Sequence, residues 1–208
     1  MSEQGQGQWL KFLIFCAVFV GIILASVVFG GYSSLYRSEG RIEITKDLFL
    51  SSCKNRLELL PQISKYLQER EQKELLAKLE QAGRDAGVVL NHAVSKKAPL
   101  DKKLTLAIEV SQSALTNELV KIFLKLDQPQ NKQNIESFKT IKQQFYSAQD
   151  LVAFERIRYN TEIRYFNTRT KIFPGYIIVK IFGFDKSEYF ELSEDSFVGA
   201  LGTFEGKA

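Results

Sequence analysis

The pattern of hydrophobic positions begins with an uninterrupted apolar run near the N-terminus. No charged residue occurs from Phe12 to Gly31, and about twenty such residues in a helix cross a hydrocarbon core of roughly 30 Å. Trp9 precedes the run, at the interfacial position that aromatic side chains favour. A cleaved signal peptide has a more basic start than the single Lys11 found here. We predict a short tail over residues 1–8 and a transmembrane helix over 9–32.

The charges that flank the apolar run predict its orientation. Lys11 lies before it, whereas Arg37, Arg41 and Lys46 follow soon after it. Basic residues gather on the cytoplasmic side of a membrane span. We therefore expect a single-pass protein of the cell (inner) membrane, with its N-terminus outside and its body in the cytoplasm.

Apolar residues recur at intervals of three and four through most of the remaining chain, as they do along the seam of a helical bundle or coiled coil. The clearest segment follows Pro99, which breaks the pattern, and Asp101, a suitable N-cap. Its seam residues are Leu104, Ile108, Ser111, Leu115, Leu119, Ile122 and Leu126. The polar run at 128–133 then breaks the pattern again, and a last helix is expected over 134–172, with its seam continuing to Phe173.

Two features before this segment decide the helix count. Pro61 interrupts the seam that starts at Phe49, and we expect a kink there rather than a stop. Residues 68–74 contain no apolar side chain, which fits either a tight turn or one exposed turn of a continuous helix. A turn divides the body into four helices that lead out and back. We therefore predict an all-α fold, with the transmembrane helix followed by an antiparallel up-and-down four-helix bundle with long helices over 33–184.

The last predicted helix carries a repeated pair of an aromatic residue and an asparagine. Tyr159-Asn160 and Phe166-Asn167 are seven residues apart, so both pairs lie on nearly one helical face. Asparagines at a seam can hydrogen-bond across a bundle and fix its register, and we expect this of Asn160 and Asn167. Glu155, also at a seam position, is expected to form a buried structural pair with a neighbouring arginine.

Beyond Pro174 the chain changes character. Residues 176–184 are strongly apolar but too few to span a membrane. They cap the end of the bundle, lie in the membrane interface or dock a partner, and capping is the preferred interpretation. Residues 185–208 carry a net charge of −4 and are predicted to form a flexible acidic tail.

Charge and candidate chemistry narrow the function class. Residues 32–184 hold 25 basic and 17 acidic side chains, a net charge of +8, which suits anionic lipids or nucleic acid but is also ordinary for a solvated helical surface. The aromatic residues follow seam spacing, which favours a core over base stacking, so no nucleic-acid partner is expected. His92, Cys16 and Cys53 lack the spacing of metal or redox sites. We expect no catalytic residue, no metal and no cofactor.

Several motifs resemble those of a known family. The run FERIRYNTEIRYFNTRTKIFPG, followed by FGF and YFE, resembles the C-terminal signature of the LemA family. The segment NRLELLPQI at 55–63 is similar to that family's Arg-rich Leu-Ile-Pro-Asn-Leu segment. The signature residues, which are also a candidate interaction surface, are Arg156, Tyr159, Asn160, Arg164, Phe166, Asn167, Phe173, Pro174, Phe182, Phe184, Tyr189 and Phe190.

The resemblance implies a bacterial, membrane-anchored helical bundle without an agreed enzymatic activity, with roles in membrane or envelope organisation. We therefore expect a non-enzymatic scaffold or adaptor that acts through its bundle surface and through self-association. The alternative is an accessory or sensor subunit of a larger membrane complex, such as a protease or a transporter. Membrane lipids are the expected partner of the span, and a second copy or another membrane protein is the expected partner of the body.

Overall fold

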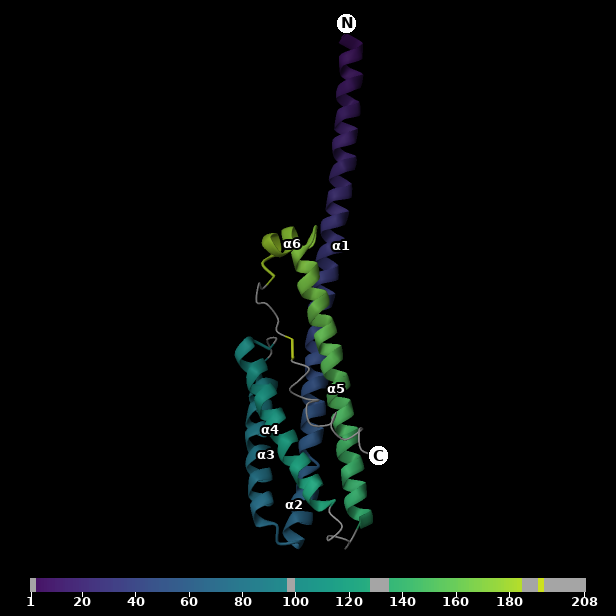
Figure 1. The fold of residues 1–208 in the computed structure, drawn as a ribbon. Helices are drawn as coiled ribbons and strands as arrows, with labels where there is room; N and C mark the ends of the chain where they lie inside the picture. The colour runs from purple at the N-terminus through teal and green to yellow at the C-terminus, as the bar shows by residue number, and fades with distance from the viewer. Residues whose placement is uncertain (1–2, 97–99, 128–134, 185–190, 193–208) are drawn as a thin grey trace. The chain divides into compact units, whose positions relative to one another are not determined.

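A computed structural model describes residues 3–96, 100–127, 135–184 and 191–192 of the 208-residue chain. Its regular elements are helices, and the described part contains no strand, so the all-α prediction is confirmed. In chain order (Figure 1), the helices are α1 (Glu3–Leu57), α2 (Leu60–Glu69), α3 (Lys73–Ser95), α4 (Lys102–Leu126), α5 (Ile135–Lys171) and α6 (Gly175–Phe182).

Internal contacts divide the chain into two units. The first unit is Met1–Gly40 with Tyr165–Ser187, and the second unit is Arg41–Arg164 with Glu188–Ala208. Both α1 and α5 contribute residues to each unit. The predicted bundle over 33–184 therefore includes parts of both units, and its four-helix arrangement stays a prediction. Since α1 begins at Glu3, no helix boundary separates the predicted tail, span and body.

The apolar N-terminal run lies within α1. It is long and apolar enough to cross a membrane, and none of it is buried inside the structure. Trp9, which lies just before the run, is exposed and packs edge-on against Phe12, with ring centroids 6.5 Å apart. A membrane-spanning helix is expected to have no protein packed around it, and the exposure of this segment agrees with that expectation.

The helix is interrupted only briefly at Pro61. After α1 ends at Leu57, α2 begins at Leu60, and Pro61 in its first turn lacks the N–H that would continue the hydrogen bonding of α1. Leu59 between them keeps right-handed helical angles, with φ −81° and ψ −19°. The structure therefore has the kink that the sequence predicts.

A tight turn separates α2 from α3, which answers the question left open for residues 68–74. The N–H of Gln72 donates to the carbonyl of Leu67 at 3.0 Å, and the N–H of Glu71 donates to Gln68 at 3.1 Å. This pair of bonds is a Schellman motif, which normally places glycine at the left-handed position. Here Glu71 occupies that position with φ 56°.

The helix α4 matches its prediction closely. The Asp101 carboxylate accepts a hydrogen bond from the Leu104 N–H at 2.8 Å, so it caps the helix as expected. The predicted polar break at 128–133 lies outside the described residues. All seven predicted seam residues are buried: Leu104, Ile108, Ser111, Leu115, Leu119, Ile122 and Leu126.

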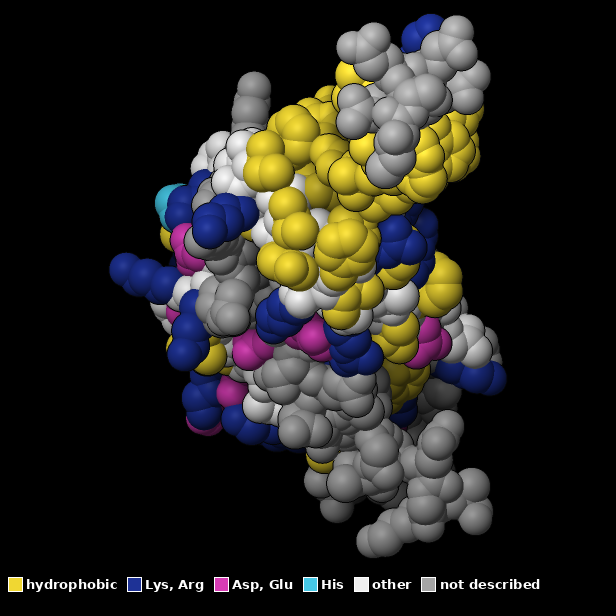
Figure 2. Space-filling model, turned by 90° about the horizontal axis from the view of Figure 1, so that it is seen from above, with side chains coloured by type: hydrophobic (Ala, Val, Ile, Leu, Met, Phe, Trp, Pro, Cys, Tyr) yellow, Lys and Arg dark blue, Asp and Glu magenta, His cyan; other side chains and the backbone are white. Residues whose placement is uncertain are grey.

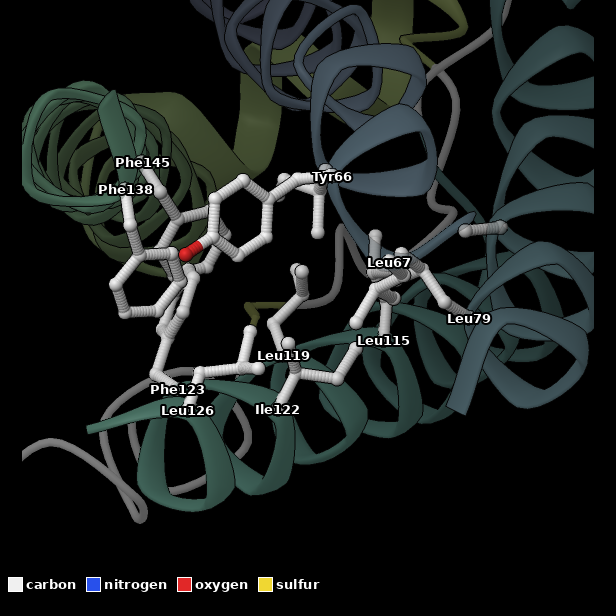
Figure 3. Packing of buried hydrophobic residues seen from close by; sticks show 12 residues of the cluster. Tyr66, Leu67, Leu79, Leu115, Leu119, Ile122, Phe123, Leu126, Phe138 and Phe145 are labelled. Atoms are coloured by element: carbon white, nitrogen blue, oxygen red, sulfur yellow. The ribbon is translucent and has the colours of Figure 1, made fainter. Parts of the chain in front are cut away.

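The second unit is held by an apolar core to which α2, α3, α4 and α5 all contribute. Aromatic rings connect the helices (Figure 3). The ring of Phe138 on α5 stacks on Tyr66 of α2 at 5.1 Å and meets Phe123 of α4 edge-on at 5.8 Å. Leu79 of α3 and Leu119 of α4 are fully buried in the same core. Burial of each such side chain contributes about 1.5–3 kcal/mol.

The contacts between α1 and α5 in the second unit show that these two helices run antiparallel. Positions on α5 decrease as positions on α1 increase, and α3 and α4 lie side by side next to them (Figure 1). The α1–α5 pairs are Arg41 with Glu162, Phe49 with Tyr159 and Arg56 with Gln149.

In the first unit, α6 folds back beside the end of α5. A Cβ atom on Gly175 would lie 1.9 Å from the Arg169 carbonyl oxygen, so only glycine permits this close approach. The Phe173–Pro174 peptide bond is cis. Phe173 is 63% exposed, so its predicted seam position is wrong, because α5 ends at Lys171 and the chain turns before Phe173.

Candidate functional site

The signature residues on α5 are mostly structural. The predicted interaction surface is corrected for its buried members, which contact the protein's own core instead. Tyr189 and Phe190 lie outside the described residues. The buried members are Arg156, Tyr159, Asn160 and Phe166, the half-buried ones are Asn167, Pro174 and Phe184, and the exposed ones are Arg164, Phe173 and Phe182.

Asn160 holds the chain that follows α6. Its Nδ2 donates to the Leu192 carbonyl at 2.7 Å, and its Oδ1 accepts from the Leu192 N–H at 2.8 Å. Leu192 itself is buried. The expectation that Asn160 bonds across the bundle between helices is therefore wrong, because both ends of its amide bond the backbone of one residue in the segment after α6.

An ion pair supports the same attachment. The Arg164 Nε lies 2.6 Å from Glu191 Oε2, next to the Asn160–Leu192 contact. The prediction of a flexible tail over 185–208 is therefore wrong at Glu191 and Leu192, which the structure places against α5. The acidic side chain at 191 pairs with a basic one of α5, and the apolar side chain at 192 enters the core.

Tyr159 and Glu155 have the environments of structural residues. The Tyr159 ring stacks on Phe49 at 6.5 Å, and burial raises the pKa of its phenol, with a smaller opposing effect from the Leu100 backbone. The Arg158 Nη1 lies 3.0 Å from both carboxylate oxygens of Glu155, so the predicted pair with a nearby arginine is present. Only its acid is buried, because the Arg158 side chain is exposed. The Tyr159 phenol therefore stays protonated at neutral pH.

A buried polar cluster lies where α1, α4 and α5 meet. Arg56 of α1 is fully buried, and its guanidinium donates to the side-chain oxygens of Gln112, Thr116 and Gln149. The bond to Thr116 Oγ1 is 3.1 Å long. In the described part of the chain no carboxylate pairs with Arg56, and its Nε and the Nε2 of Gln112 have no hydrogen-bond partner. Burial lowers the pKa of Arg56.

Cys53, one turn before Arg56, is also buried and free. Burial raises the pKa of its thiol to about 12, although the charge of Arg56 acts in the opposite direction. A thiol that is protonated at neutral pH is a poor nucleophile and a poor metal ligand. This fits the expectation that Cys53 has no redox or metal role.

The sequence carries a signal for this polar cluster in the spacing of its residues from buried apolar positions. Arg56 lies seven residues after Phe49, and Gln112 and Gln149 each lie four residues after a buried apolar residue of their helix. Polar residues at seam positions on three helices indicate a polar layer, but only the fold shows that the three are at one level.

The sequence profile of the LemA family matches residues 49–198, which is more than half of the chain. The chain belongs to the LemA family. Searches among curated proteins and among solved structures gave no match.

The matched region of this LemA protein contains the residues that hold its helices and its C-terminal segment in place. It includes Arg56, Asn160 and Leu192, so both the polar cluster and the attachment of the C-terminal segment lie within it. It starts at residue 49 and leaves out the apolar run of α1.

A surface hollow on the LemA protein's second unit lies close to the signature residues of α5. Its volume is about 260 Å³, and it lies between α1 and α5, where Arg41 pairs with Glu162 at 2.9 Å. Exposed apolar side chains border it, namely Ile44 and Ile157. Within the described residues no group of three or more His, Cys, Asp or Glu could hold a metal ion.

Proposed function

We propose that this LemA protein is a single-span membrane protein whose helical body is a non-enzymatic scaffold or adaptor in membrane or envelope organisation. The apolar segment of α1 is the observation that carries this proposal. It is long enough to span a bilayer and has no protein packed around it. Exposure of so much apolar surface to water is rare in soluble proteins, so a lipid environment accounts for it.

We infer the orientation from the charges near the span. Three basic residues follow the span, namely Arg37, Arg41 and Lys46, whereas Lys11 is the one basic side chain that precedes it. The body then lies in the cytoplasm and the N-terminus lies outside the cell (inner) membrane.

A scaffold role is supported by the way the body uses its polar groups. We infer that the helices following the span form the antiparallel four-helix bundle, with Arg56 bonded to neutral side chains inside it. Asn160 and Glu155 are each occupied by a structural partner. These groups stabilise a single arrangement of the helices. A scaffold needs such a fixed arrangement, because it binds its partners through surfaces of constant shape.

Membrane anchoring and orientation are tested in cells. The full chain should remain in the membrane fraction after alkaline carbonate extraction, whereas a variant with Ile14→Asp, Val18→Asp and Ile22→Asp should be released. A C-terminal green fluorescent protein fusion should be fluorescent, and a C-terminal alkaline phosphatase fusion should be inactive. Release of the unaltered chain by carbonate contradicts anchoring, and the opposite reporter pattern contradicts the orientation.

The scaffold role is tested through self-association. We propose the exposed apolar side chains beside the hollow, Ile44, Phe154 and Ile157, as the contact face. Crosslinking in membranes should capture homo-oligomers that Ile157→Asp reduces. The matched control is Leu106→Asp, an exposed apolar residue of α4, which should leave them unchanged. One stoichiometric foreign partner in place of homo-oligomers would instead support the accessory-subunit alternative.

A further inference from the structure

The short helix α6 is attached to α1 at the position where the apolar run ends. Ile178 of α6 is fully buried, and a Cβ atom on Gly31 would lie 2.3 Å from its Cδ1 atom. The next residue of α1, Tyr32, packs its ring on Phe182 with centroids 4.9 Å apart. An Arg169–Ser34 hydrogen bond of 2.6 Å adds a polar contact in the same unit. The level of α6 along α1 is therefore fixed by several contacts.

The other face of this region is apolar and uncovered. Figure 2 shows hydrophobic side chains gathered over α1 and α6. A soluble surface rarely exposes apolar groups contiguously on this scale. The exposed side chains that follow α5 and continue along α6 are each between 52% and 64% accessible, and they are Ile172, Phe173, Tyr176 and Ile181.

We propose that α6 is an interfacial helix, lying in the headgroup region of the bilayer that α1 crosses, with its exposed apolar face among the upper acyl chains. This inference rests on the proposed membrane span. About twenty residues of helix fill the hydrocarbon core, and the charge-free run ends at Gly31. A helix that contacts Gly31 and Tyr32 therefore lies at the boundary between hydrocarbon and headgroups.

The charges of this region suit anionic headgroups. Lys171 precedes the exposed apolar residues, Lys180 lies among them, and both lysines are exposed. Arg37 lies five residues after Tyr32 on α1. The sequence has no acidic residue from 163 to 184 or from 12 to 38. Basic side chains near an anionic membrane surface are attracted to its headgroups. The apolar face and the two lysines together make α6 a lipid-binding element.

The test places a single tryptophan on α6 of the full chain. Trp9 is the protein's only tryptophan, so Tyr176→Trp in a Trp9→Phe background reports on α6 alone, and the unaltered chain reports on the span. Each protein is reconstituted in vesicles of phosphatidylcholine and phosphatidylglycerol that carry bromine atoms at shallow or deep acyl positions. Shallow bromines should quench the Tyr176→Trp variant about twofold more strongly than deep ones, because an interfacial helix lies roughly 5–10 Å into the headgroup boundary.

Two further variants make the result decisive. Ile181→Trp provides a second reporter on the same face in case Tyr176→Trp perturbs folding. Val88→Trp in the same Trp9→Phe background, at an exposed apolar position on α3, is the matched control and should not be quenched. Changing Lys171 and Lys180 together to glutamate should reduce the shallow quenching of the Tyr176→Trp reporter in anionic vesicles and have less effect in phosphatidylcholine alone.

The outcomes separate this inference from the proposed function. Quenching of Trp9 without quenching at 176 and 181 overturns the interfacial helix and leaves the membrane span intact. Quenching at neither Trp9 nor α6 contradicts the span itself. Equal quenching at 88 and 176 also overturns the inference, because α6 would then have no preferred contact with lipid.

Discussion

Asn160 and Leu192, 32 residues apart in sequence, form a reciprocal pair of hydrogen bonds in which one side-chain amide satisfies both backbone groups of the other residue. Both residues are buried. The pair therefore fixes where the segment after α6 returns to α5.

Replacing this amide should release the returning segment. Asn160→Leu has a similar volume but leaves the Leu192 N–H and carbonyl unsatisfied, at a cost of about 1–3 kcal/mol for each buried group. We expect a lower free energy of unfolding in detergent and faster proteolysis near residue 192. Asn91→Leu, at an exposed position of α3, is the control. Equal proteolysis of both variants would show that the Asn160 contact does not hold the segment.

The buried charge of Arg56 predicts a non-additive set of substitutions. Gln112→Leu removes the acceptor of Nη2 and should destabilise the protein by about 3 kcal/mol, because it leaves a buried charge less satisfied. The triple change Arg56→Met, Gln112→Leu and Gln149→Leu should regain this loss, since an apolar layer needs no partners. Chemical denaturation of the full chain in detergent measures both.

Gln144→Leu, at an exposed position of α5, is the control for the added apolar side chain and should change stability by less than about 0.5 kcal/mol. If the triple variant is as unstable as Gln112→Leu alone, an apolar layer cannot replace the Arg56 cluster, and the prediction is contradicted.

The turn between α2 and α3 should accept glycine with a gain in stability. Glu71 has a left-handed backbone, which costs a residue with a side chain roughly 1–2 kcal/mol and costs glycine almost nothing. Glu71→Gly should raise the free energy of unfolding by about 1 kcal/mol. Glu69→Gly, within α2, should lower it by a similar amount because glycine disfavours helix. A loss of stability on Glu71→Gly would contradict the turn geometry.

Alkaline pH should destabilise this protein through groups that stay protonated when buried. The pKa of Cys53 is raised from 9.0 to about 12, and that of Tyr159 is also raised. The unfolded chain therefore releases these protons at a lower pH than the folded chain. Stability is fully present below pH 9 and falls as pH rises, by at most about 1.4 kcal/mol per pH unit for each group.

The thiol part of this dependence can be isolated. Cys53→Ala should make the decline between pH 9 and 11 less steep, and Cys16→Ala should leave it unchanged, when unfolding is followed in detergent by circular dichroism. A decline that is the same in both variants would mean that the Cys53 thiol does not contribute.

Local signals in the sequence predicted much of the helical structure. The spacing from Leu104 to Leu126 and the cap at Asp101 depend only on neighbouring residues, and α4 follows them closely. Pro61 acts on the hydrogen bonds of its own helix, so its kink was also predictable. Phe173 was wrongly assigned to the seam because its spacing continues the apolar pattern, whereas α5 ends two residues earlier at Lys171.

The features of the candidate site depend on distant contacts, which spacing does not contain. The Asn160 amide could bond another helix or a loop, and nothing in its neighbours selects Leu192. Likewise, Arg56 belongs to a polar layer only because α4 and α5 bring Gln112 and Gln149 to its level. From its spacing alone, Arg56 could equally be a solvent-exposed residue of α1.

The contact between Gly31 and Ile178 limits how far the anchor can be exchanged for another. Any apolar helix of similar length could hold a protein in a bilayer, but a larger residue at position 31 would occupy the space that Ile178 fills. A chimera carrying a foreign span would therefore insert normally and still lose the attachment of α6. The proposed membrane span is in that sense not a generic module, because its last turn also serves as a docking site for another helix of the same chain.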